Sequence, residues 1–371
     1  ATMVAAGVYL LMRSHGLLEG WPLELAGWVG GVTAVAGAAI ALAQDDLKRI
    51  LAGSTTSQLG LMFVGVAAGG PAVALFHLVA HAAGKAGLFL TTGIFQHARG
   101  STALAHLRGA GREDRVTFAL FAVCAASIAA VPPLAAFWSK EHIAAGAEEA
   151  RVVWFVLVLI AAAGSAAYLL RPALLLWGSE RKAQPATAKW RGRVPMLAAL
   201  AVTTVGSLGL GALGEPLVRL LDSAPLPSST SSLALSLLAT AAGAVAVLAG
   251  ARLPAALRRA AARQLYVNEL LRAVVQRPLL ALASASDVVE RRCIDAAVDA
   301  VGRAGLRAAR SQEWVERRGI DAAVDSAAAA VGRGGEDLRR LQSGRLYEYL
   351  RDATLGAAAV AVLIALTALL R

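Results

Sequence analysis

Long apolar runs separated by short polar segments fill the first two thirds of the chain, and one more apolar run closes it. A helix needs about 20 residues to cross roughly 30 Å of hydrocarbon. The runs therefore predict membrane-spanning helices near residues 1–13, 25–43, 51–69, 72–97, 116–147, 152–177, 194–214, 233–251 and 353–370. The first run is too short to cross alone, so we interpret it as the end of a span that begins upstream.

One predicted span is longer than a single crossing requires. Residues 116–147 contain Pro132 and Pro133, and proline interrupts a helix because it lacks an N–H group and clashes with the preceding turn. We therefore expect a broken helix at this place. The fold class predicted is an all-α polytopic membrane protein, a bundle of about nine transmembrane helices.

The segment between the last two spans has a different pattern. It is rich in arginine, acidic residues and alanine, which favours helix, and its apolar positions form one stripe. We expect three regions: a transmembrane bundle over 1–252, an amphipathic region over 253–352, and a C-terminal anchor helix over 353–371. The amphipathic region is either a soluble helical hairpin or a long helix along the membrane surface.

The amphipathic region contains an internal duplication. Residues 289–299 return at 315–325, with Gly319 in place of Cys293 as the single change. An offset of 26 residues turns an ideal helix about 80° beyond whole turns, so the two apolar stripes would not align in a straight helix. The pattern predicts a kink, for which glycines at 302, 305, 319, 332, 334 and 335 offer places.

The loop charges alternate along the chain. Cations gather in every second loop: Arg99, Arg108, Arg112 and Arg115, then Arg181, Lys182, Lys189, Arg191 and Arg193, then Arg252, Arg258 and Arg259. Lysine and arginine collect in short cytoplasmic loops of membrane proteins. The alternation predicts that the amphipathic region lies on the cytoplasmic side and that the C-terminal tip lies across the membrane.

The composition agrees with a membrane protein. The 371 residues are 57% hydrophobic and 16% charged, against about 45–50% and about 25% in soluble proteins. Cys124 and Cys293 are too few for a disulfide framework. The net charge of +11 is spread too unevenly to indicate a nucleic-acid partner.

Three titratable residues lie inside one predicted span. His77, His81 and Lys85 are spaced four apart, which places them on one helix face about 6 Å apart along the axis. A ladder of such groups can carry protons, because imidazole titrates near neutral pH and a buried lysine can lose its charge. A histidine metal site, haem ligation with His15, His97, His106 or His142, and a purely structural role are the alternatives.

Two further polar clusters accompany this ladder. Lys140 and Glu141 follow the predicted proline break, where Lys140 could instead extend its amine to the membrane surface. Asp46, Lys48 and Arg49 join two spans on the predicted cytoplasmic side. By themselves the latter three indicate a capped helix start, and we keep them as candidate cytoplasmic-side charges.

Several motifs together resemble the large antiporter-like subunit of respiratory complex I, called subunit 5 or chain L. The run from Asp46 to Gly60 resembles the family signature D-[IL]-K-R-x-L-A-x-S-T-x-S-Q-x-G, and the run from Phe76 to Leu90 resembles F-H-x-x-x-H-x-x-x-K-A-x-L-F-L. Phe137-Trp138-Ser139-Lys140 is similar to the family's F-[FW]-S-K break. The start of the chain and the polar segment before the last span also resemble this family, of which the chain would be the C-terminal part.

The resemblance implies a function. It places His77, His81 and Lys85 on a central proton path, with Lys140 and Glu141 at the exit side, in a proton-translocating subunit of NADH-quinone oxidoreductase. It implies that this chain holds no cofactor or redox centre. It implies further that FMN, iron–sulfur clusters and quinone are bound by partner subunits. It also implies contacts with other membrane subunits, partly through the lateral helix, and a multi-pass position in the bacterial inner membrane.

The chain also departs from the family pattern. The family usually has S-K-D-E-I, whereas this chain has an imidazole at His142. The family's proton-uptake half would lie upstream of residue 1. Alternatives are an Mrp-type cation/proton antiporter or inorganic-carbon uptake subunit, and, from another class, a haem- or quinone-binding membrane anchor.

Overall fold

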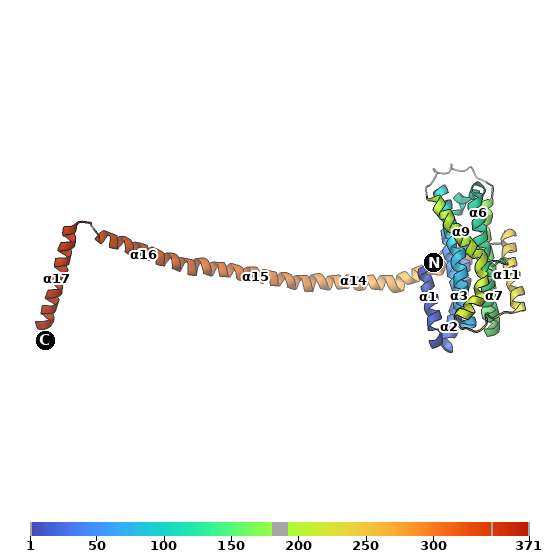
Figure 1. The fold of residues 1–371 in the computed structure, drawn as a ribbon, viewed down its shortest axis with the longest axis horizontal. Coiled ribbons are helices and arrows are strands. Elements are labelled where there is room, and N and C mark those ends of the chain that lie inside the picture. The colour runs from blue at the N-terminus through green and yellow to red at the C-terminus, as the bar shows by residue number, and fades with distance from the viewer. Residues whose placement is uncertain (1, 180–191, 343, 370–371) are drawn as a thin grey trace. The chain divides into compact units, whose positions relative to one another are not determined.

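The computed structural model describes residues 2–179, 192–342 and 344–369, and these residues are almost all helical (Figure 1). Within them the sole strand-like feature is an isolated bridge between Asp46 and Ala103. The chain divides into two compact units, residues 1–272 and 273–371. The predicted all-α membrane fold is confirmed, and each unit is described by itself below.

The first unit is a helical bundle. Its long helices are α1 (Thr2–Ser14), α2 (Trp21–Ala43), α3 (Leu47–Arg99), α6 (Arg115–Ile128), α7 (Ala135–Ala150), α8 (Val152–Trp177), α9 (Arg193–Gly209) and α11 (Thr230–Leu248). Short helices connect them: η1 (His15–Leu17), α4 (Leu104–Leu107), α5 (Ala110–Glu113), η2 (Leu210–Leu213), α10 (Gly214–Leu220), α12 (Ala255–Ala262), η3 (Gln264–Tyr266) and α13 (Val267–Leu271).

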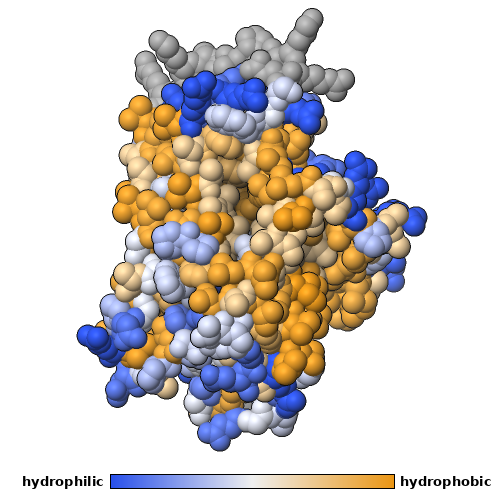
Figure 2. Space-filling view, turned by 90° about the vertical axis from the view of Figure 1, so that its right-hand side faces the viewer, coloured by the Kyte–Doolittle hydropathy of each residue, from blue (hydrophilic) through white to orange (hydrophobic). Residues whose placement is uncertain are grey.

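The surface of this unit suits a lipid bilayer. Five of its helical stretches, together with α17 of the second unit, make up the 6 found among the described residues that are long and apolar enough to cross a membrane. Figure 2 shows hydrophilic residues gathered at the upper and lower ends of the bundle and a hydrophobic band between them. Large apolar side chains such as Val202 and Leu238 are exposed on the bundle, as lipid-facing side chains are.

Two helices are interrupted inside the bundle. In α3, Gly70 adopts a φ of +82° directly before Pro71, so the helix forms two crossings, as the sequence predicts for 51–69 and 72–97. The predicted break within 116–147 is also present, since α6 ends at Ile128 and α7 begins at Ala135.

Small residues bring α2 and α3 into close contact. A Cβ atom added to Gly37 would collide with the backbone of Ser57, and one added to Gly60 would collide with the backbone of Ala34. The Ser57 hydroxyl donates to the Ala34 carbonyl at 2.8 Å. Close backbone approach of this kind replaces the hydrophobic driving force that membrane helices lack.

The loops with many cations lie at one end of the bundle. The Leu47 N–H donates to the Thr102 carbonyl at 2.9 Å, and the Arg112 side chain donates to the Trp177 carbonyl at 2.6 Å, so the segments after α2, α3 and α8 meet. Arg181, Lys182, Lys189 and Arg191 fall outside the described residues. That this end is cytoplasmic stays a prediction from the loop charges.

The compact bundle unit extends beyond residue 252. Helix α12 packs against α2, and Ala261 within it is fully buried. The domain limits at 252 and 352 that the sequence predicts stay predictions.

The second unit is a succession of exposed helices. It begins within η4 (Arg272–Gln276) and continues with α14 (Arg277–Val289), η5 (Glu290–Asp295), α15 (Ala296–Val315), η6 (Glu316–Asp321), α16 (Ala322–Leu341) and α17 (Leu346–Leu369). All residues from 277 to 340 are exposed. Figure 1 shows α14, α15 and α16 following one another along a single line.

The duplicated segments contain π-helical turns, η5 and η6, one in each copy. A kink at the glycines stays a prediction. Gly319 is in the second turn, but Cys293 takes its place in the first, and the other five glycines lie in α-helix. A π turn absorbs one extra residue, so it changes the direction in which the apolar stripe faces.

Candidate functional site

The second half of α3 carries the titratable ladder into the bundle interior. His77, His81 and Lys85 are at most 3% exposed. They therefore face neighbouring helices rather than lipid. A buried polar group costs free energy unless it finds a hydrogen-bond partner, so the partners of each side chain decide what it can do.

His77 links three helices. Its Nε2 donates to Gln58 Oε1 at 3.1 Å, because the Gln58 amide nitrogen is engaged in donating to the Tyr168 hydroxyl at 3.0 Å. Its Nδ1 is hydrogen-bonded to the Ser139 hydroxyl at 2.8 Å. The imidazole therefore connects the two halves of α3 with α7 and, through Gln58, with α8.

His81 lies beside His77 and is left partly unsatisfied. The two rings are 6.2 Å apart between centroids. Nε2 of His81 is buried and has no hydrogen-bond partner among the described residues. Leaving such an atom unpaired costs about 1–3 kcal/mol, so we expect a water molecule or a proton-exchange partner at this ring nitrogen.

Lys85 holds its amine inside the bundle on a neutral acceptor. Nζ donates to the Leu51 carbonyl, on the first half of α3, at 2.9 Å. Among the described residues no carboxylate pairs with it, although charged side chains are seldom buried without a counter-charge. The amine can therefore exchange a proton without breaking an ion pair.

The break between α6 and α7 creates the second amine site. Because α6 stops at Ile128, its last carbonyl groups lack helical partners. Lys140 Nζ donates to the Ile128 carbonyl at 2.6 Å and to Ser165 Oγ on α8 at 2.9 Å. Lys140 is only 5% exposed, so the alternative in which its amine extends to the membrane surface is wrong.

Glu141 faces the other end of the bundle from the arginine-rich loops. Its Oε1 accepts from the Ser232 hydroxyl at 3.0 Å, near the start of α11. Its Oε2 lies 3.3 Å from His142 Nδ1, which also donates to the Pro227 carbonyl at 2.7 Å. A cavity of about 10 Å³ is lined by both Lys140 and Glu141, and this is room for about one water molecule.

The structure brings together five of the eight predicted site residues. His77, His81 and Lys85 share one helix face, and the Ser139 contact joins that face to the helix of Lys140 and Glu141. Asp46, Lys48 and Arg49 lie apart from them at the arginine-rich end. Asp46 caps α3, accepting from the Arg49 N–H at 3.1 Å, while the side chains of Lys48 and Arg49 are exposed.

Sequence reasoning missed four neutral members of this site: Gln58, Ser139, Ser165 and Tyr168. Gln58 and Ser139 lie inside the motifs quoted above, which was the available signal. Ser165 and Tyr168 lie on α8 in an apolar run without such a signal. In the described part of the chain, no group of three or more histidine, cysteine or acidic side chains could hold a metal ion.

Comparisons with known proteins agree on the kind of domain. Residues 1–164 match the family described as NADH:quinone oxidoreductase/Mrp antiporter, transmembrane. The chloroplastic NAD(P)H-quinone oxidoreductase subunit 5 of Zygnema circumcarinatum is 41% identical over 182 residues, which are 46% of this chain and 26% of that protein. NAD(P)H-quinone oxidoreductase chain 5 of Picosynechococcus sp. is 42% identical over 168 residues, 42% of this chain and 25% of that protein.

Solved structures extend the likeness to more of the chain. The Mrp complex from Dietzia sp. contains a chain that superposes with a TM-score of 0.64 and 28% identity, covering 84% of this chain and 36% of that one. The archaeal membrane-bound sulfane sulfur reductase has a similar fold, with a TM-score of 0.50 and 23% identity, over 65% of this chain and 47% of that one. This chain spans about a quarter of the length of the curated relatives it matches.

Proposed function

We propose that this chain, whose residues 1–164 match the NADH:quinone oxidoreductase/Mrp antiporter family, is a proton-translocating membrane subunit of NADH:quinone oxidoreductase. The observation that carries the proposal is the buried row of His77, His81 and Lys85. These groups can each hold a proton, and a hydrogen bond joins their helix to the helix of Lys140.

In this proposal the proton moves along buried side chains that differ in their hydrogen-bond partners. His81 has a free ring nitrogen that can take a proton from Lys85 or pass one toward His77 and Ser139. Lys140 receives it beside the helix break, and Glu141 with His142 leads it toward Ser232 at the opposite end from the arginine-rich loops. Water molecules complete the steps for which the described residues offer no direct hydrogen bond.

Electrostatic repulsion between two protonated groups gives the relay a direction when a neighbouring group gains a proton. Two unit charges about 6 Å apart repel by about 3 kcal/mol at an effective dielectric constant near 20. A second proton on the ladder therefore drives the first one onward. In this proposal the redox reaction occurs in partner subunits that hold FMN, iron–sulfur clusters and quinone, and this chain binds none of them.

The proposal includes a location and partners. The chain crosses the bacterial cell membrane several times, and the exposed second unit contacts neighbouring membrane subunits on the cytoplasmic side. The support is the apolar surface of the bundle together with a region, 277–340, in which all residues are exposed.

The test is Lys85→Met in the intact membrane complex reconstituted into vesicles. Removing an essential proton donor or acceptor costs about 10²-fold or more in transfer rate, so NADH-driven acidification through this chain should be lost. The control is Arg108→Met, which removes an exposed cation at the arginine-rich end. Undiminished proton translocation per NADH oxidised in the Lys85 variant would disprove the relay.

A second function is favoured by one observation. The superposition on a chain of the Dietzia Mrp complex covers 84% of this chain, which supports a cation/proton antiporter. The same relay residues would then exchange protons for sodium without a redox reaction. A sodium gradient imposed on vesicles in the absence of NADH distinguishes the two, since only the antiporter should then acidify or alkalinise the lumen.

A further inference from the structure

A cavity outside the proton path opens at the arginine-rich end of the bundle. It has a volume of about 640 Å³ and lies among the end of α2, the last turns of α8, the end of α11 and the segment leading into α12. This volume is typical of small-molecule sites. Its walls are partly apolar, with Leu42, Ala167, Val247 and Leu253, and partly cationic.

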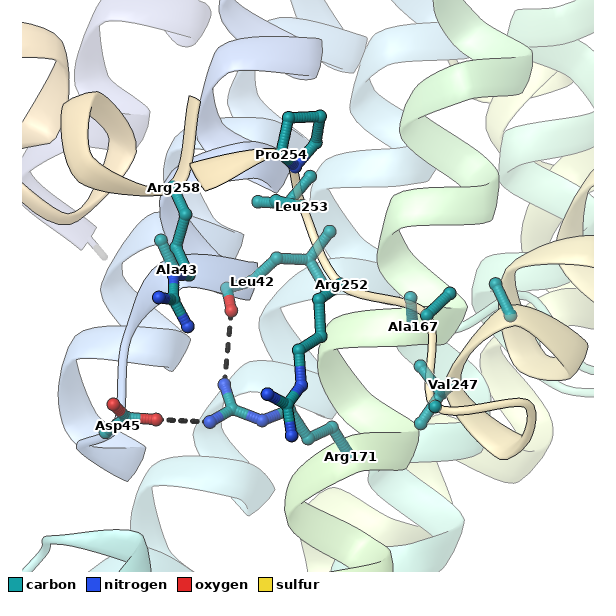
Figure 3. Close-up of a pocket in the computed structure, with 13 residues that line it drawn as sticks. Leu42, Ala43, Asp45, Ala167, Arg171, Val247, Arg252, Leu253, Pro254 and Arg258 are labelled. Carbon is teal, nitrogen blue, oxygen red and sulfur yellow. Dashed lines mark hydrogen bonds and ion pairs between the residues drawn. The ribbon is translucent and has the colours of Figure 1, made fainter. Parts of the chain in front are cut away.

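Three arginines and one acid supply the charge. Arg171, Arg252 and Arg258 line the cavity together with Asp45, and Figure 3 shows their guanidinium groups turned toward one another from different segments. Arg171 forms an ion pair with Asp45. Within the described chain, no carboxylate pairs with Arg252 or Arg258, so the cavity has an excess of two positive charges.

Arg171 is a fixed part of the cavity wall. It donates to the Leu42 carbonyl at 3.1 Å and to the Gln44 carbonyl at 2.8 Å, in addition to its pair with Asp45. These contacts hold the end of α2 against α8. Arg252 and Arg258 have no such restraints, and both are exposed, which leaves their guanidinium groups available for a ligand.

The position of the cavity indicates which anion it suits. It adjoins the end of α11, whose apolar Val245 and Leu248 are 61% and 66% exposed. A ligand here meets cations at one end and a lipid-covered helix at the other. Arginine binds phosphate oxygens through two parallel N–H groups, and basic pockets between transmembrane helices suit anionic headgroups.

We propose that this cavity binds the phosphate group of an anionic phospholipid. The phosphodiester lies between Arg252 and Arg258, and the fixed Arg171 lines the cavity beside it. The acyl chains run along α11. A free phosphate ion shares the charge chemistry but would leave the apolar wall uncovered. The bound lipid would tie the ends of α2, α8 and α11 to the first turn of α12.

The experiment compares lipid binding by the purified complex that contains the full chain, in phosphatidylcholine nanodiscs with and without phosphatidylglycerol. Native mass spectrometry and thermal unfolding report bound lipid and stabilisation. We expect Arg252→Gln with Arg258→Gln to weaken phosphatidylglycerol binding by roughly tenfold or more, since charge-assisted hydrogen bonds are among the strong ones. The single variant Arg258→Glu, at an exposed position, should weaken it similarly.

A matched control removes two other exposed cations at the same end, Arg108→Gln with Arg115→Gln. Both double variants lose two cations, so the general electrostatic attraction of the surface for anionic lipid falls equally in both. Only a specific site in the cavity would make phosphatidylglycerol binding differ between the two double variants. Equal lipid binding by the two double variants would overturn the proposal. Equal stabilisation by inorganic phosphate in pure phosphatidylcholine would show a site for soluble anions and would overturn the lipid as its occupant.

Discussion

Asp114 stabilises the start of α6 and its neighbour α9 with one carboxylate. Its Oδ1 accepts from the Thr117 N–H at 3.1 Å, and its Oδ2 accepts from the Thr117 hydroxyl and from Arg193, both at 2.8 Å. Burial raises the pKa of Asp114, but the hydrogen bonds from Thr117 and the neighbouring Arg193 outweigh this effect and hold the pKa below its ordinary value. The folded state therefore favours the charged form.

We expect Asp114→Ala to lower the free energy of unfolding by about 1 kcal/mol, the usual effect of losing a helix cap. Asp114→Asn keeps the cap and loses the ion pair, so its loss should be smaller. Because the folded pKa is depressed, the carboxylate stabilises fully above the ordinary value of about 3.9, and this contribution is lost as the pH falls through the folded value. Thermal unfolding in detergent at several pH values measures this contribution. The prediction is contradicted if the difference in stability between the wild type and Asp114→Asn does not shrink below about pH 4.

At the residue scale, the sequence predicted the charged members of the candidate site better than the neutral ones. His77, His81, Lys85 and Lys140 are conspicuous because ionisable side chains are rare inside membrane spans. Tyr168 and Ser165 are ordinary residues in an apolar helix, and their importance depends on which helix packs against them. That information lies in the packing of α8 against α3 and α7 and not in local spacing.

At the scale of elements, the duplicated segments and the π turns have one physical explanation. Each 26-residue repeat contains one π turn, and a π turn absorbs one residue. In a regular helix, equivalent positions of the two copies are rotated by about 80° past whole turns. With one residue absorbed by a π turn, they are about 20° short of whole turns. Ile294 and Val298 therefore share a face with Ile320 and Val324, which a regular helix of this sequence would not allow.

This explanation predicts that a deletion is tolerated in one place and harmful in another. Removing Gly319 from η6 should convert the π turn to α-helix and leave the downstream face unchanged. Removing Ala308 from regular α15 should rotate everything after it by about 100°. Co-purification of the chain with its complex measures the outcome, and equal loss of assembly in the two deletions would contradict the explanation.

Proline and length were enough to predict the interruptions of the bundle, whereas the π turns were not predictable. The length of the apolar stretch predicted two crossings over 51–69 and 72–97, and Pro132 and Pro133 predicted the break within 116–147, because a missing N–H group is visible in the sequence. A π turn has ordinary composition, and Gly319 is replaced by Cys293 in the other copy. The repeat itself was the signal, but it indicated a change of helix phase without indicating its form.

On the scale of the whole molecule, the two units are stabilised in different ways. The bundle has buried cores, such as the cluster around Phe121 and Tyr168, whereas no residue between 277 and 340 is buried. The exposed helices have local ion pairs such as Arg317 with Glu313 at 2.7 Å, and such pairs contribute only about 0.3–0.5 kcal/mol. Helices without tertiary packing are marginally stable, so we expect a partner or a membrane surface to stabilise this region.

Limited proteolysis should reveal this dependence. In the purified chain alone in detergent, trypsin should cleave within 277–340, at sites such as Arg303 and Arg310, before it cleaves inside the bundle helices, because local unfolding exposes the backbone of unpacked helices first. In the assembled complex the same bonds should be protected by roughly tenfold or more in rate, since a bound partner must dissociate before the helix can open. Mass spectrometry of the released peptides identifies the bonds. Matched vesicles without partner subunits separate the two sources of protection, and cleavage at the same rate in all three preparations would show that the apolar stripe of this region contacts neither a protein nor a bilayer.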